Sequence, residues 1–225
     1  NFIMKHLFYL IGLVCIVSCS ASKKNPVKNT TDVRVKITTG DGAMVIKLYN
    51  ETPRHRDNFV SLVKKHFYDS LLFHRVEKEF IIQAGDPASK YAKTGQKLGE
   101  GSLNYTVPAE YGPDLFHKKG AVAAAKEVNN NPQKRSNSTQ FYIVEGKTFT
   151  DGEMDRMEEK LHIKIPESHR QVYRTIGGLP FLDMNNSVFG EVVSGLDVLD
   201  KIANEPTDAN ERPLKNIRMK ITLMK

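Results

Sequence analysis

A chain of 225 residues, 40% of them hydrophobic, is long enough for one substantial domain with a buried core. Its formal net charge of +7 could indicate a nucleic-acid-binding protein, but Lys and Arg are interleaved with Asp and Glu, and no basic helix or aromatic-studded basic stripe occurs. We therefore interpret the charge as a solvated basic surface and expect no nucleic-acid partner.

A short hydrophobic segment precedes a cysteine near the start of the chain. Lys5 gives it a positive beginning after Met4, which we take as the first translated residue, and residues 7–17 are apolar over the length of a signal peptide. The run is too short for a stable membrane-spanning helix. Because Ile-Val-Ser-Cys at 16–19 resembles a bacterial lipobox, we predict a lipoprotein signal peptide at residues 1–18 and lipid on Cys19. The alternative is an uncleaved signal anchor with a chance cysteine.

A polar tether, residues 19–31, is expected to connect this lipid to a domain that spans residues 32–225. Both cysteines of the chain, Cys15 and Cys19, lie ahead of that domain, so we expect no disulfide in the fold. Attachment by several acyl chains would be stable, since a single chain binds a membrane only marginally. The expected location is the bacterial cell envelope, with the protein anchored to a membrane and facing the periplasm or the exterior.

Alternating apolar and polar residues predict a strand at the start of the domain. The apolar positions are Val33, Val35 and Ile37. A glycine turn at 40–42 then returns the chain as a second strand over residues 43–48.

A helix is predicted next, with Thr52 as its N-cap and Pro53 at its first position. Its apolar side consists of Phe59, Leu62 and Val63, which recur at helical spacing. We expect His55 and His66, in the same segment, to be exposed.

Residues 71–84 have the pattern strand, polar turn, strand, and Gly-Asp-Pro follows as a stop. Because side chains alternate between the two faces of a strand, we expect Arg75 to share a face with Phe73, and Gln83 with Ile81. This would place a guanidinium and an amide beside apolar side chains on one sheet.

The second half contains a run of small residues, 120–125, which propensity alone would allow to be helical, and a buried strand at 140–144. Residues 145–178 are predicted to form a helical hairpin, with helices over 151–161 and 166–176. The apolar residues at helical spacing are Met154, Met157 and Leu161 in the first helix, and Val172 and Ile176 in the second.

Four separated motifs, in order over residues 33–223, resemble the cyclophilin family of peptidyl-prolyl cis/trans isomerases. They comprise F-H-R-x4-F-x2-Q-x-G-D-P at 73–87, Q-F-Y-I at 140–143, F-L-D at 181–183 and V-F-G-E-V at 188–192. The resemblance implies a mainly β fold: a closed antiparallel barrel capped by helices, with residues 120–125 as a strand beside the substrate groove. The hairpin at about 145–178 is then an insertion. It also implies a monomeric enzyme without metal or cofactor, whose partners are unfolded or folding proteins with X-Pro bonds.

The same resemblance assigns roles to residues. Arg75 matches the arginine that stabilises the twisted amide, and Gln83 matches the amide that binds the substrate backbone and orients that arginine. The remaining positions of the substrate groove are matched by Phe80, Ile81, Ala125, Lys126, Gln140, Tyr142, Phe181, Leu182 and Asn186. Among them, Phe80, Ile81, Tyr142 and Leu182 match the proline pocket, and Ala125 with Lys126 matches the edge that pairs with the peptide.

Three of these positions depart from the common family pattern. Ile81 stands where Met is common, which keeps the pocket apolar but stiffens it. Phe181 stands where many members carry Trp, so the indole N–H donor is lost. Asn186 stands where His is frequent, so a polar contact survives without a titratable group.

Two functions from different classes fit this sequence. The first is an active, lipid-anchored prolyl isomerase that assists protein folding in a bacterial envelope. The second is a membrane-tethered module that binds Pro-containing segments, or holds unfolded chains, with little turnover; the fold alone does not separate the two. For the insertion, we hypothesise contacts with larger clients outside the proline pocket.

Overall fold

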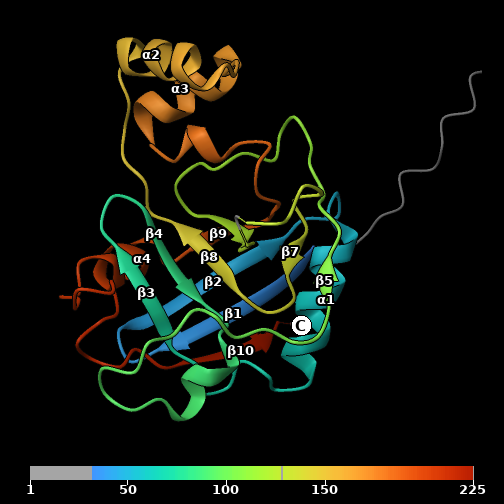
Figure 1. Cartoon of the computed structure of the whole chain (residues 1–225), viewed down its shortest axis with the longest axis vertical. Coiled ribbons are helices and arrows are strands. Elements are labelled where there is room, and N and C mark those ends of the chain that lie inside the picture. Colours follow the sequence, from blue (N-terminus) through green and yellow to red (C-terminus); the bar gives the residue numbers. More distant parts are fainter. Residues whose placement is uncertain (1–31, 128, 225) are drawn as a thin grey trace, which may run out of the picture. The chain divides into compact units, whose positions relative to one another are not determined.

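An antiparallel sheet of eight strands organises the domain in the computed structural model, which describes residues 32–127 and 129–224 (Figure 1). The predicted signal peptide, Cys19 and the tether lie outside the described residues. Within those residues, no helix is long and apolar enough to cross a membrane.

The strands and helices predicted from the sequence are present, in the predicted order, among the elements of the described residues. The strands are β1 (Val33–Thr39), β2 (Gly42–Leu48), β3 (Phe73–Glu77), β4 (Ile81–Ala84), β5 (Thr106–Val107), β6 (Ala121–Ala124), β7 (Ser136–Asn137), β8 (Phe141–Val144), β9 (Val188–Ser194) and β10 (Met219–Leu223). The helices are α1 (Pro53–Lys64), α2 (Asp151–Leu161), α3 (Glu167–Thr175) and α4 (Leu196–Ala203), with 3-10 turns η1 (Pro87–Tyr91) and η2 (Pro180–Leu182).

The main sheet curls into a barrel whose two edges meet along a short seam. Its strand order is β10-β1-β2-β9-β6-β8-β4-β3, and β5 pairs with β7 in a separate ribbon. The edge strands β10 and β3 are joined through a single bridge between Leu72 and Arg218 and through Phe73 N–H, which donates to Ile217 O at 3.0 Å. The predicted barrel is therefore present, closed by this seam rather than by a continuous ladder.

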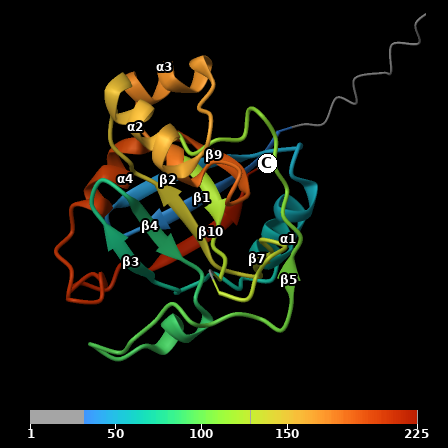
Figure 2. The same ribbon diagram turned by 45° about the horizontal axis from the view of Figure 1, so that its top comes forward.

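The inside of the curled sheet is the main hydrophobic core, built from inward-facing strand residues such as Ile37, Ile46, Ile82 and Ile143, all fully buried. Helix α1 packs Phe59, Leu62 and Val63 into this core, as their spacing predicts. Helix α4 buries Leu199 and Ile202 in the same core, and the two helices lie at opposite ends of the curled sheet (Figures 1 and 2).

The N-terminus of α1 differs from the prediction in two respects. Thr52 is the N-cap residue, but its side chain makes no capping hydrogen bond; the carboxylate of Glu110 accepts from the backbone N–H groups of Arg54 and His55 instead. The expectation that His55 is exposed is wrong. Its ring is buried between Glu110, 2.6 Å from Nδ1, and the hydroxyl of Ser136, 2.9 Å from Nε2.

The run of small residues forms a central strand, β6, between β8 and β9. Ala121 and Ala123 face outward and Val122 and Ala124 inward, and all four are buried because both faces of the sheet are covered here. Tertiary pairing thus overrides the helical propensity of alanine.

The insertion is a helical hairpin, as predicted, and it stands off the sheet after β8 (Figure 2). Helix α2 starts with a capping box between Thr150 and Glu153 and buries Met154. Helix α3 buries Tyr173, His169 and Arg170, whereas Ile176, expected on its apolar side, is 53% exposed.

Arg170 joins the two helices of the hairpin electrostatically. Its guanidinium lies within 4.0 Å of the carboxylates of Asp151, Asp155, Glu158 and Glu167. Most of these partners are exposed, so the cluster holds the hairpin together by number and geometry rather than by one strong pair.

Candidate active site

A row of side chains crosses the outer face of the sheet where the sequence motifs converge. Cross-strand register places Arg75 opposite Gln83, Gln83 opposite Tyr142, and Tyr142 opposite Ala123. Residues directly opposite one another in an antiparallel sheet lie on the same face. Arg75 and Gln83 therefore stand beside Tyr142 on the face away from the main core.

Phe73 does not share this face, contrary to the expectation from simple alternation. The β3–β4 register shifts between Phe73 and Arg75, so His74 is an extra residue there. A bulge of this kind breaks the two-residue period. Phe73 packs into the inner core with Val76, and Arg75 points outward.

Two carboxylates hold the guanidinium of Arg75. Its Nε donates to Glu211 Oε2 at 2.5 Å, and its Nη2 donates to Glu77 Oε1. Burial and the hydrogen bond with Glu211 raise the pKa of Glu77. Although burial opposes it, the hydrogen bonds from Arg75 and Glu77 lower the pKa of Glu211. Charge-assisted bonds to two acceptors fix the plane of the guanidinium.

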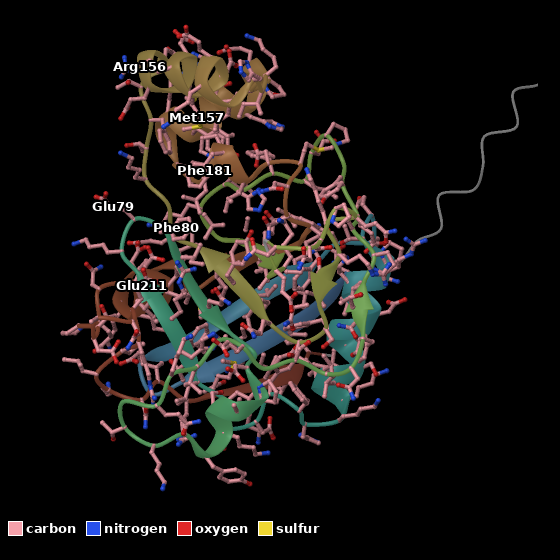
Figure 3. The ribbon with its side chains drawn as sticks, viewed as in Figure 1. Glu79, Phe80, Arg156, Met157, Phe181 and Glu211 are labelled. Atoms are coloured by element: carbon pink, nitrogen blue, oxygen red, sulfur yellow. The ribbon has the colours of Figure 1, made fainter. Side chains whose placement is uncertain are left out.

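The face of the guanidinium lies over an aromatic ring. Arg75 Cζ is 5.5 Å from the ring centroid of Phe80, within the range of a cation–π contact. Figure 3 shows Phe80 above Glu211 on this side of the sheet, with Phe181 above Phe80.

Gln83 is paired with Gln140 rather than with Arg75. Its Nε2 donates to Gln140 Oε1 at 2.9 Å, and Gln140 Nε2 in turn donates to the carbonyls of Gly99 and Gly101. Because Gln140 uses both ends of its amide, it fixes the orientation of Gln83, whose own Oε1 remains an acceptor.

The apolar positions of the predicted site come together in a second hydrophobic cluster on the same outer face. Ile81 and Tyr142 are buried in it, and Phe80 and Leu182 pack against it. The ring of Phe181, 38% exposed, stacks on Phe80 with centroids 6.2 Å apart. We call the five residues Phe80, Ile81, Tyr142, Phe181 and Leu182 the apolar patch.

A hollow of about 500 Å³ lies on the Gln83 side of the apolar patch. It is lined by Gln83, Gln140, Ala125 and Lys126, and also by Gly99, Glu100, Glu127, Asn129 and Asn137. The main chain of Ala125 is already paired, since its N–H donates to Gln140 O and its carbonyl accepts from Asn137 N. The edge that was expected to pair with a peptide is therefore occupied at Ala125.

Asn186 makes the polar contact expected of it, but with the scaffold. Its Nδ2 donates to the carbonyl of Ala124 at 3.2 Å, and the residue is buried. It therefore supports β6 behind the groove.

Four polar residues of this site were given no role from the sequence, although Asp183 is part of the F-L-D motif. Glu77 and Glu211 bind Arg75, and His117 and Asp183 lie behind Tyr142, with His117 Nε2 3.0 Å from the tyrosine hydroxyl. Burial raises the pKa of Tyr142 well above its usual value, so its hydroxyl stays protonated. In the sequence, only the hydroxyl of Tyr142, in a strand predicted to be buried, indicated that a hydrogen-bond partner was needed. Buried hydroxyl groups are almost always hydrogen-bonded.

Chemically, the arrangement offers a fixed cationic donor, a neutral amide and an apolar surface. These groups can bind a peptide and stabilise a change in its hydrogen bonding. Among the described residues, no group of three His, Cys, Asp or Glu side chains is placed to hold a metal ion.

Comparison with known proteins identifies the family to which the chain belongs. The family model for cyclophilin type peptidyl-prolyl cis-trans isomerase/CLD matches residues 34–223. A Staphylococcus haemolyticus protein described as "Putative peptidyl-prolyl cis-trans isomerase" is 30% identical over 187 residues, covering 83% of this chain and 88% of that protein. A Staphylococcus aureus protein with the same description is 31% identical over the same coverage.

Among solved structures, a cyclophilin type peptidyl-prolyl cis-trans isomerase from Cryptosporidium parvum matches with a TM-score of 0.63 and 23% identity, over 87% of this chain and 99% of that chain. A second structure of that protein, in the presence of the dipeptide Ala-Pro, gives 0.61 over 85% of this chain. These likenesses establish the fold, and the family model and curated relatives go further. The chain belongs to the cyclophilin-type peptidyl-prolyl cis-trans isomerases.

Proposed function

We propose that Arg75 drives the isomerisation by donating a hydrogen bond to the proline nitrogen of an X-Pro bond in its twisted state. Rotation about a peptide bond faces a barrier of about 18–20 kcal/mol because the C–N bond has partial double-bond character. In the twisted state the nitrogen becomes pyramidal and accepts a hydrogen bond, which the planar amide does poorly. A donor that meets it there stabilises the transition state selectively.

The observation that carries this proposal is the way in which the guanidinium is held. Nε and Nη2 are bound to Glu211 and Glu77, and the face lies over Phe80. No described residue accepts a hydrogen bond from Nη1. Both N–H donors of Nη1 and the second N–H of Nη2 are thus left for a substrate, beside the apolar patch.

The size of the effect limits what Arg75 does alone. A hydrogen bond from a charged donor contributes about 1.5–3 kcal/mol, and about 1.4 kcal/mol is a tenfold change in rate. Arg75 therefore supplies about ten- to a hundredfold. The remainder is assigned to the apolar patch, which removes water from the amide and holds the proline ring, and to Gln83 and Lys126, which bind the peptide backbone.

Replacing Arg75 tests this assignment. With the domain from Ser20 onward and an X-Pro tetrapeptide, we expect Arg75→Ala to lower kcat/KM at least tenfold without unfolding the protein. Arg75→Lys should recover little, because an ammonium lacks the planar fork that reaches two carboxylates and a substrate together. Arg156→Ala, which removes an exposed arginine from α2, is the matched control and should leave kcat/KM unchanged.

The two carboxylates also give the alternative function its one specific support. Glu77 and Glu211 offset the charge of Arg75, and a neutralised donor would suit a module that binds Pro-containing segments with little turnover. The same assay decides between them, since wild-type turnover equal to the uncatalysed rate would favour the binding module.

We further propose that the clients are envelope proteins and that lipid on Cys19 anchors the enzyme to a membrane. The support is the charged start, apolar run and lipobox-like residues of the leading segment. A tethered domain would meet chains as they emerge on the same side of the membrane.

A further inference from the structure

A buried chain of hydrogen bonds connects the insertion to the apolar patch. Tyr173 on α3 donates its hydroxyl to Asp183 Oδ2 at 2.7 Å. Asp183 Oδ1 is 2.9 Å from His117 Nδ1 and also accepts from the backbone N–H of His117 at 2.8 Å. His117 Nε2 is 3.0 Å from the hydroxyl of Tyr142. Tyr173 and His117 are fully buried, and Tyr142 is 4% exposed.

The carboxylate sets the direction of every bond in this chain. Asp183 can only accept, so His117 donates from Nδ1. A neutral imidazole then presents Nε2 as an acceptor, and Tyr142 donates to it. Tyr173 donates to the other carboxylate oxygen. His169 Nδ1, 3.9 Å from Asp183, is beyond hydrogen-bond distance.

The same junction is fixed by close backbone packing. Leu179 N–H donates to His117 O at 2.8 Å. A Cβ placed on Gly178 would lie 2.2 Å from His117 O and 2.6 Å from the ring of Tyr173, so only glycine fits there. The return of the insertion is therefore packed directly against the residue that orients Tyr142.

We propose that Tyr173 is a positioning residue for the proline pocket: through Asp183 and His117 it fixes the ring of Tyr142, the buried floor of the apolar patch. This rests on the proposed function of that patch as the proline-binding surface. The insertion thus has a role in the isomerase site itself, although it provides no side chain to the patch.

The substitution Tyr173→Phe removes one hydroxyl and keeps the ring, which packs edge-on against Phe116. We expect KM for the X-Pro tetrapeptide to rise three- to tenfold with little change in kcat, because the floor contacts the proline ring in the ground and transition states alike. In a Tyr142→Phe background the hydroxyl through which Tyr173 acts is gone, so Tyr173→Phe should then have no further effect.

The control is Tyr68→Phe, which removes another buried tyrosine hydroxyl, donated to Thr139 O in the main core. It should lower stability without raising KM. A merely structural role for Tyr173 would reduce the active fraction, and hence the apparent kcat, at constant KM. Unchanged KM in Tyr173→Phe, or equal effects in both backgrounds, would overturn the proposal.

The tetrapeptide's Kd, followed by NMR titration, separates this proposal from the proposed function. If the wild type bound the peptide but did not turn it over, the proposed catalysis would fail, and the same double-mutant pattern in Kd would still support the role of Tyr173. A wild type that did not bind the peptide would overturn both.

Discussion

His74, next to Arg75, is an imidazole buried at the bulge in β3, with 3% of its surface exposed. Burial lowers its pKa to about 4, although the charge of Asp86 opposes the shift. Between about pH 4 and pH 6.5 the ring is therefore still neutral in the folded protein. In the unfolded chain, with an ordinary histidine pKa near 6.5, it takes up a proton over the same range.

This difference predicts acid sensitivity. Above about pH 6.5 neither state is protonated at His74, so it has no effect. As the pH falls from about 6.5 to about 4, only the unfolded state gains the proton, and stability falls by up to about 3 kcal/mol. Urea unfolding of His74→Leu across this range should show a shallower loss of stability than the wild type.

Burial also lowers the pKa of His55, so part of the slope will remain in the variant. The exposed His162, at the C-cap of α2 in a left-handed conformation, provides the control as His162→Asn, which should keep the wild-type slope. If His74→Leu also kept the wild-type slope, the buried imidazole would not be the cause of the acid sensitivity.

At the same scale, the sequence indicated which residues form the site but not how they are held. Arg75 and Gln83 were predicted from their motif, and both lie on the outer face of the sheet. Their partners could not be predicted, because Glu211 is 136 residues from Arg75 and Gln140 is 57 residues from Gln83. The bulge at His74 could not be predicted either, because we assumed strict alternation of side chains along the strand.

At the scale of elements, the sequence predicted the features that depend on residues close together in the chain. The apolar spacing of α2 predicted its bounds, Asp151–Leu161, and a local capping box starts the helix. The buried face of α3 was predicted wrongly, because its partners Phe116 and Asp183 lie elsewhere in the chain. Thr52 is the N-cap of α1 as predicted, but the N–H groups of Arg54 and His55 donate to Glu110, which is distant in the chain.

The insertion as a whole can be tested by replacing residues 147–177 with a short Gly-Ser link. If it contacts larger clients, the variant should lose no more tetrapeptide activity than Tyr173→Phe, within about tenfold, but should accelerate the refolding of a proline-limited protein much less. The loss on the protein substrate beyond that on the peptide measures the client contacts.

Folding of the replaced variant is checked first by circular dichroism, because Phe116 loses its ring contacts with His169 and Tyr173. Equal losses on the peptide and the protein substrate would show that the insertion acts only through the apolar patch.

At the scale of the whole molecule, the anchor is proposed from a leading segment outside the described residues. We expect Cys19→Ala to abolish incorporation of labelled palmitate and lipoprotein-type cleavage, because the lipid is attached to the thiol. Cys15→Ala, which changes the other cysteine, should be labelled like the wild type. Palmitate incorporation by Cys19→Ala would contradict the anchor.

The pairing of β10 with β1 sets the order in which the domain can be assembled during synthesis. Val35 pairs with Leu223 and Ile37 with Ile221, so the strand made first acquires one of its two neighbours only after nearly all the domain has been made. Such distant pairings form slowly, because the long intervening chain must be ordered before the contact stabilises it. The hairpin of α2 and α3 can form earlier, because its two helices are adjacent in the chain. During synthesis the helical hairpin can thus fold before the sheet, which is completed only when residues 219–223 emerge.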